Sequence, residues 1–104
     1  MSAVIIVATA YPMPEHKAEV IAAFEAAIAQ VHNEEAGCEL YALHEGRDRL
    51  VMIEKYASQD AVAEHSKGAG LDGLRKALEG KLSAPLDVQI LVPHPAGIPS
   101  KGAL

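Results

Sequence analysis

The residues best suited to acid–base chemistry lie in one short stretch of the chain, which contains Glu54, Tyr56 and His65. Glu54 stands in the middle of an apolar segment, where an unpaired carboxylate is costly to bury, so it should be paired, exposed or functional. Because an imidazole titrates close to neutral pH, His65 is the preferred general base. Tyr56 shares a strand face with Glu54, so it could stack on an aromatic substrate or donate to a developing oxyanion.

Each of these residues also has a purely structural interpretation. His65 could be a buried histidine bonded to a backbone carbonyl, Glu54 could bond a neighbouring backbone group or a partner subunit, and Tyr56 could pack at a pocket rim. If Glu54 contacts His65 instead, it would fix the imidazole tautomer and raise its basicity. Four weaker candidates could line the same pocket: His44, Tyr11, Tyr41 and Phe24. Core packing is the favoured role for Phe24.

Composition argues against several classes of function. The 14 acidic residues outnumber the nine basic ones, and no basic block is present, so neither nucleic acid nor an anionic membrane surface is an expected partner. The histidines show no HxH or HxxxH spacing, so no metal site is predicted. A single cysteine, Cys38, allows no internal disulfide and suits a reducing, cytoplasmic location. The longest apolar run, Ala3 to Ala8, is far shorter than the roughly 20 residues that cross a bilayer.

Hydrophobic periodicity predicts an α+β fold with the order β-α-β-β-α-β, in which the second helix is broken. A β-branched run should form a first strand that is apolar on both faces, and a left-handed glycine, Gly37, should close the first helix. A turn at residues 46–49 makes the two central strands a hairpin. The predicted elements are a strand at 3–10, a helix from Pro14, strands at 38–45 and 50–57, two short helices between Ser58 and Gly80, and a strand at 86–93.

This ferredoxin-like order leaves one face of the antiparallel sheet without helices. The first strand is apolar on that side too, and leaving its large side chains in water would forgo roughly 1.5–3 kcal/mol each. We therefore expect a homodimer that forms through the sheet faces. The predicted domain covers residues 1–93, and residues 94–104 form an irregular tail in which Ile98 and Leu104 could dock on a surface.

The stretch EAGCELYALHE at residues 35–45, followed by LVMIEKYASQDAVAEH at residues 50–65, resembles the antibiotic biosynthesis monooxygenase family. A Leu-rich helix and a closing strand extend the resemblance over residues 4–93. The resemblance implies a dimeric α+β barrel with a ligand pocket between the helices and the sheet of each subunit. Family members include cofactor-independent oxygenases of quinols and aromatic polyketides, haem-degrading enzymes and an isomerase of a signalling sugar phosphate, so the family predicts fold better than reaction.

Two departures from the family pattern narrow the expected function. Tyr56 stands where relatives often have Trp, and the only asparagine, Asn33, falls in the first helix, whereas haem-degrading members use an Asn of the first strand. We therefore expect a cofactor-independent monooxygenase that uses dioxygen and a small quinol, phenolic or polyketide-like aromatic substrate, with His65 as the base and Glu54 and Tyr56 as support. The alternatives are an isomerase that uses the same base for enolisation and a non-catalytic ligand-binding dimer.

Overall fold

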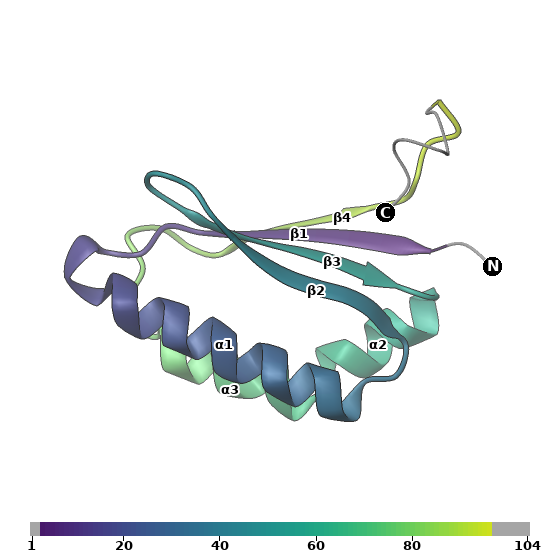
Figure 1. The fold of residues 1–104 in the computed structure, drawn as a ribbon, viewed down its shortest axis with the longest axis horizontal. Helices are drawn as coiled ribbons and strands as arrows, with labels where there is room; N and C mark the ends of the chain where they lie inside the picture. Colours follow the sequence, from purple (N-terminus) through teal and green to yellow (C-terminus); the bar gives the residue numbers. More distant parts are fainter. Residues whose placement is uncertain (1–2, 97–104) are drawn as a thin grey trace.

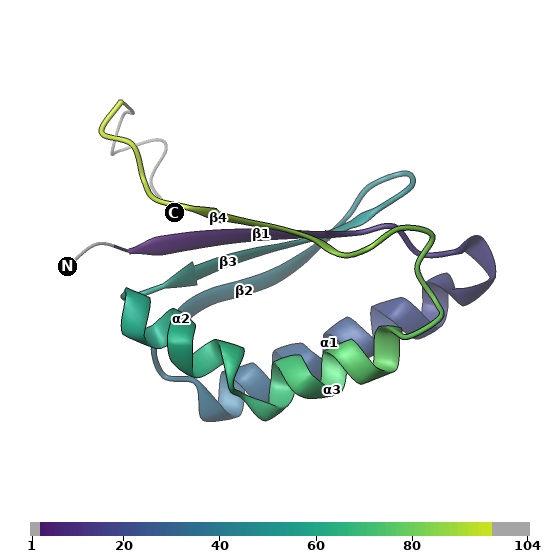
Figure 2. The same cartoon turned by 180° about the vertical axis from the view of Figure 1, so that it is seen from behind.

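The computed structural model describes residues 3–96 and shows a four-stranded antiparallel sheet with all of its helices on one face (Figures 1 and 2). The strand order is β2-β3-β1-β4. This arrangement confirms the predicted α+β, ferredoxin-like class. The elements are β1 (Val4–Ala10), the 3₁₀ turn η1 (Pro14–His16), α1 (Lys17–Glu34), β2 (Cys38–Glu45), β3 (Leu50–Tyr56), α2 (Gln59–Ser66), α3 (Ala69–Leu78) and β4 (Asp87–Leu91).

Local sequence signals account for most element boundaries. The Ser58 hydroxyl accepts a hydrogen bond from the Ala61 amide at 3.2 Å, so it caps α2 as predicted. Pro14 opens a single 3₁₀ turn, and the α-helix begins only at Lys17.

Within residues 3–96, no helix combines the length and apolar character that spanning a bilayer would need. Of the predicted tail, only residues 94–96 lie in the described part of the chain, and Ile98 and Leu104 lie outside it.

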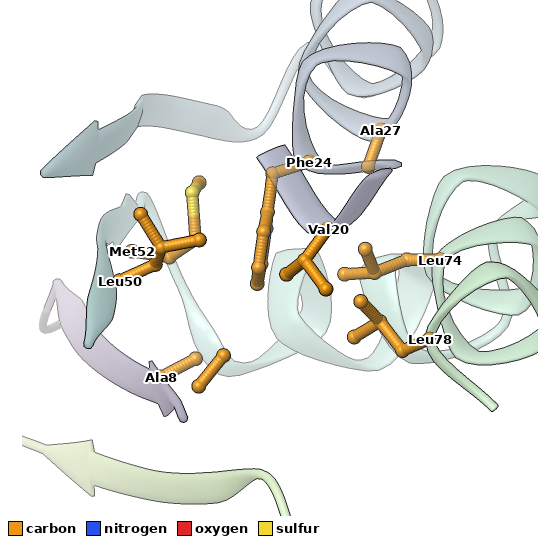
Figure 3. Packing of buried hydrophobic residues seen from close by; sticks show 9 residues of the cluster. Ala8, Val20, Phe24, Ala27, Leu50, Met52, Leu74 and Leu78 are labelled. Atoms are coloured by element: carbon orange, nitrogen blue, oxygen red, sulfur yellow. The ribbon is translucent and has the colours of Figure 1, made fainter. Parts of the chain in front are cut away.

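The two faces of the sheet differ in burial, because successive side chains of a strand point to opposite faces and the helices cover only one of them. In β1, Val4, Ile6 and Ala8 are buried beneath the helices, whereas Ile5 and Val7 on the other face are only partly buried. Phe24 of α1 lies between its helix and the sheet, and the side chains around it come from α1, α3, β1 and β3 (Figure 3). The labelled residues of this core are Ala8, Val20, Phe24, Ala27, Leu50, Met52, Leu74 and Leu78.

A register shift early in β2 alters which side chains share a face. The pairing of β2 with β3 shifts between Cys38 and Leu40, so Cys38 lies opposite Tyr56 on the helix-covered face. Simple alternation would instead have grouped Cys38 with Leu40. Burial raises the pKa of the Cys38 thiol to about 11, which favours a packing role over a nucleophilic one.

Gly37 is required for a different reason from the one predicted. Among residues 3–96, Gly80 is the only residue with a positive φ, at 73°, so the prediction of a left-handed Gly37 was wrong. A Cβ atom on Gly37 would lie 2.6 Å from the Cβ of Ala61. The glycine therefore lets α2 approach the turn that follows α1, and this turn carries Glu35.

We expect Gly37→Ala to destabilise the fold by roughly 1–3 kcal/mol, since the added methyl group overpacks the contact with Ala61. Thermal unfolding followed by circular dichroism would measure this as a lower melting temperature. Gly73→Ala is the matched control, because a Cβ at Gly73 in α3 meets no atom within 4 Å and alanine favours the helix. If Gly37→Ala melted as high as the wild type, close packing at this turn would not explain the glycine.

Candidate active site

A cavity of about 440 Å³ lies between the helices and the covered face of the sheet. This volume falls within the range of small-molecule sites. Its walls are mainly apolar and come from all four strands and from α1, α2 and α3. The apolar side chains include Ile6, Ala8, Phe24, Met52, Leu71 and Leu74. The part of this lining around Glu54 and His65 is buried, which strengthens the electrostatic interactions made there, whereas Val88 and Ile90 of β4 are exposed.

Two ionisable side chains, Glu54 and His65, lie on the wall of this apolar cavity. Glu54 is only 3 % exposed and His65 only 5 % exposed. Their partners come from three separate segments. His65 Nδ1 lies 2.7 Å from Glu35 Oε1, His65 Nε2 lies 3.7 Å from Glu54 Oε1, and the Tyr56 hydroxyl donates to Glu54 Oε1 at 2.7 Å. These contacts form a continuous buried chain from Tyr56 through Glu54 and His65 to Glu35.

The short contact with Glu35 determines the chemical state in which His65 can act. A carboxylate 2.7 Å from Nδ1 accepts a hydrogen bond from that nitrogen, which assigns the proton of the neutral imidazole to Nδ1. The lone pair then resides on Nε2, the nitrogen on the side of Glu54. Two aromatic rings hold the imidazole in place, since the Tyr41 and Tyr56 centroids lie 5.5 Å and 5.1 Å from it. The arrangement suits a positioned proton acceptor.

Burial dominates the electrostatics of the site. The pKa of Glu54 is raised because the carboxylate loses water, although the Tyr56 hydrogen bond and the nearby His65 partly oppose that rise. The negative charge of Glu35 raises it further. Burial also raises the pKa of Tyr41 and of Tyr56, so both phenols stay protonated at neutral pH, and Tyr56 donates its proton to the hydrogen bond with Glu54.

The structure brings together most, but not all, of the residues selected from the sequence. Glu54 and His65 line the cavity together with Tyr41 and Phe24. Tyr56 does not line it; its side chain is fully buried behind the wall, where it bonds Glu54. Within residues 3–96, no group of three or more His, Cys, Asp or Glu side chains is arranged to hold a metal ion.

Tyr11 and His44 lie away from this cavity. The Tyr11 ring packs against the guanidinium of Arg49, and the distance from the ring centroid to Arg49 Cζ is 4.9 Å. His44 pairs in register with Val51, on the sheet face without helices, and its Nδ1 lies 3.2 Å from the Ala42 carbonyl oxygen. Strand alternation explains why His44 lies outside the cavity. Tyr41 of the same strand points to the helices, so His44, three positions later, must point to the opposite face.

Glu35 is the site residue that sequence reasoning did not select. It follows the last residue of α1, where an acidic side chain is ordinarily a solvated helix end. Its side chain is instead only 10 % exposed and bonds His65, thirty residues further along the chain. The signal was present as the Glu-x-Gly turn at residues 35–37, because Gly37 permits the close approach of α2 that places His65 beside Glu35.

The sheet order and the helices on a single face define a ferredoxin-like α+β protein, in which a buried histidine lies between two carboxylates beside an apolar cavity. The sequence of residues 3–76 matches the family model for antibiotic biosynthesis monooxygenases. The chain belongs to the antibiotic biosynthesis monooxygenase family, as its sequence resemblance implied.

Solved structures support the fold over most of the chain. Rv0793 from Mycobacterium tuberculosis superimposes with a TM-score of 0.83 at 29% identity, covering 89% of this chain and 96% of that one. A Caulobacter crescentus protein provisionally assigned to the same family superimposes with a TM-score of 0.83 at 24% identity, covering 89% of this chain and 91% of that one. PA3566 from Pseudomonas aeruginosa superimposes with a TM-score of 0.79 at 23% identity, covering 90% of this chain and 96% of that one. A search of proteins with curated functions finds no match.

Proposed function

We propose that this protein is a cofactor-independent monooxygenase that oxidises a small quinol, phenolic or polyketide-like aromatic substrate with dioxygen. The observation that carries the proposal is the position of His65, buried on the wall of an apolar cavity with a carboxylate at each ring nitrogen. Family membership supports an oxygenase over other uses of the same pocket.

In the proposed reaction, His65 Nε2 takes the proton of a substrate hydroxyl, and Glu35 stabilises the resulting imidazolium through Nδ1. Ionisation makes the aromatic ring electron-rich enough to transfer two electrons to dioxygen, which forms a peroxide on a ring carbon that carries a hydrogen. That C–H bond loses its proton as the O–O bond breaks, so the carbon becomes a carbonyl and the substrate has supplied four electrons in all. The outer oxygen leaves as water, with this proton and the one that His65 returns. The apolar walls hold the ring and dioxygen together and keep water from quenching the intermediate.

Oxygen uptake in the presence of a naphthoquinol and of an anthrone tests this proposal. The rate measured without protein is subtracted, and saturable uptake with an oxidised aromatic product is the expected result. An isomerase would convert its substrate equally well without oxygen, and a pure binding protein would saturate without turnover. Either of those outcomes, or uptake no faster than the background, would overturn the proposal.

We further propose that the active form is a homodimer joined through the sheet faces that carry no helices. Many of the residues that project from this face are apolar, and in the single chain they are partly buried or, like Leu91, exposed. They include Ile5, Val7, Leu40, Val51, Ile53 and Leu91. A second copy of the same face is the simplest cover, since it buries two such apolar surfaces at once.

We expect Ile53→Glu to convert the dimer into a monomer. Ile53 lies between Val7 and Ala42 in the sheet, so the substitution places an unpaired charge inside the proposed apolar interface in each subunit. Burying an unpaired charge costs several kcal/mol, which corresponds to at least a hundredfold weaker association. Sedimentation equilibrium at micromolar concentration measures the association of the subunits. Ala29→Glu, on the exposed side of α1, is the control and should leave the dimer intact. A wild-type protein that sediments at 11.0 kDa would refute the dimer.

A further inference from the structure

The cavity has a charged rim as well as a buried acid–base site. Of the described residues that line it, Arg75 of α3 alone carries a permanent positive charge. Arg75 and Ser66 are exposed, whereas His65 and Glu54 are almost completely buried. The lining therefore runs from a buried acidic site to an exposed guanidinium at the mouth.

The guanidinium of Arg75 has no counter-ion within residues 3–96. Asp72, one turn earlier on α3, pairs instead with Lys76, whose Nζ lies 3.3 Å from the Asp72 carboxylate. Ser66 is occupied as well, because its hydroxyl donates to the Ala63 carbonyl at 2.7 Å. A rim cation with its donors unused is available to a ligand, and a guanidinium matches a carboxylate with two parallel hydrogen bonds.

The charges at the two ends of the cavity favour one orientation of an anionic ligand. Glu54 and Glu35 surround His65 and would repel a carboxylate placed at the buried site. Arg75 would attract the same group at the rim, although the chain as a whole carries a net charge of −5. A hydroxyl group, by contrast, can enter the buried site and donate its proton to His65.

We propose that the cavity selects aromatic substrates that carry a carboxylate, with the reacting hydroxyl at His65 and the carboxylate at Arg75. The oxidation of such a substrate rests on the function proposed above. The charge preference does not, because it concerns binding alone and can be measured with ligands that are not oxidised.

The test compares 6-hydroxy-2-naphthoate with 2-naphthol, which share the fused rings and the hydroxyl group and differ only in the carboxylate. Isothermal titration calorimetry with the full-length protein gives both dissociation constants. We expect the naphthoate to bind about five- to tenfold more tightly than the naphthol, and the preference to shrink as ionic strength rises. Arg75→Gln should abolish the preference, whereas Arg75→Lys should retain part of it.

Lys76→Gln is the matched control, because it removes an equal charge from the neighbouring exposed position, which does not line the cavity. It should leave the preference unchanged. Equal affinities in the wild type, an unchanged preference in Arg75→Gln, or no measurable binding of the naphthoate would each overturn the inference. If the preference holds but no substrate supports oxygen uptake, only the monooxygenase proposal fails.

Discussion

His65→Ala is expected to lower the rate of substrate-dependent oxygen uptake by about 10²- to 10⁴-fold, the usual contribution of a positioned general base. The substitution removes the only group described here that links Glu35 and Glu54, so these carboxylates lose their shared partner. Steady-state oxygen-electrode measurements across a pH series would record the loss.

His44→Ala is the matched control for this experiment, because His44 lies on the opposite face of the sheet and is exposed. Its rate should stay within about twofold of the wild type. Circular dichroism separates lost chemistry from lost folding, since removing a buried, paired residue also destabilises the protein. A folded His65→Ala variant with wild-type oxygen uptake would contradict the assignment of the base.

Glu54→Gln is expected to reduce activity by about ten- to a hundredfold while increasing stability at neutral pH. The Glu54 carboxylate lies 3.7 Å from His65 Nε2, so its negative charge stabilises the positive charge that His65 gains when it takes the substrate proton. Glutamine keeps an oxygen that accepts the Tyr56 hydrogen bond. It also removes a carboxylate whose ionisation is disfavoured by burial.

The sign of the pH dependence follows from the direction of the Glu54 shift. Burial raises the pKa of Glu54 above its ordinary value of 4.5, so the folded protein holds that proton more tightly than the unfolded chain. Wild-type stability is therefore lost, relative to Glu54→Gln, as the pH rises through the raised pKa. Below pH 4 the two proteins should differ least, since the carboxyl is neutral in both states.

Melting temperatures of the wild type and Glu54→Gln between pH 4 and pH 8 measure this difference. Glu25→Gln, at an exposed position on α1, controls for the loss of a surface carboxylate and should show little pH-dependent change. If the difference between wild type and Glu54→Gln were constant with pH, or grew towards acid, the Glu54 pKa would not be raised in the folded state.

The fold was accessible from the sequence because its signals are local. Three such signals are the β-branched run of β1, the Ser58 cap and the apolar spacing of Leu71, Leu74 and Leu78, each of which depends on residues a few positions apart. Such patterns determine the type and order of the elements almost independently of what they pack against. The β-branched run of β1 also predicted that this strand is apolar on the sheet face without helices.

The composition of the site depended on tertiary contacts. The Tyr56–Glu54 hydrogen bond joins residues of one strand, and its two partners were both selected from the sequence. The Glu35–His65 contact joins residues thirty positions apart, and only the close packing of α2 at Gly37 creates it. In the sequence, nothing distinguishes Arg75 from an ordinary surface cation. Only the position of α3 over the sheet places it on the cavity wall.

By itself, the sequence determined the order of strands and helices and the family, and it selected His65 and Glu54 as candidates for proton transfer, because these follow from residue types and short-range spacing. Only the tertiary structure decided that Glu35 completes the pair, that Tyr11 and His44 lie elsewhere, and that a cation stands at the cavity mouth. The physical reason is that hydrogen bonds and charge interactions act over a few ångströms of space. Which distant residues come that close is set by strand register and helix packing.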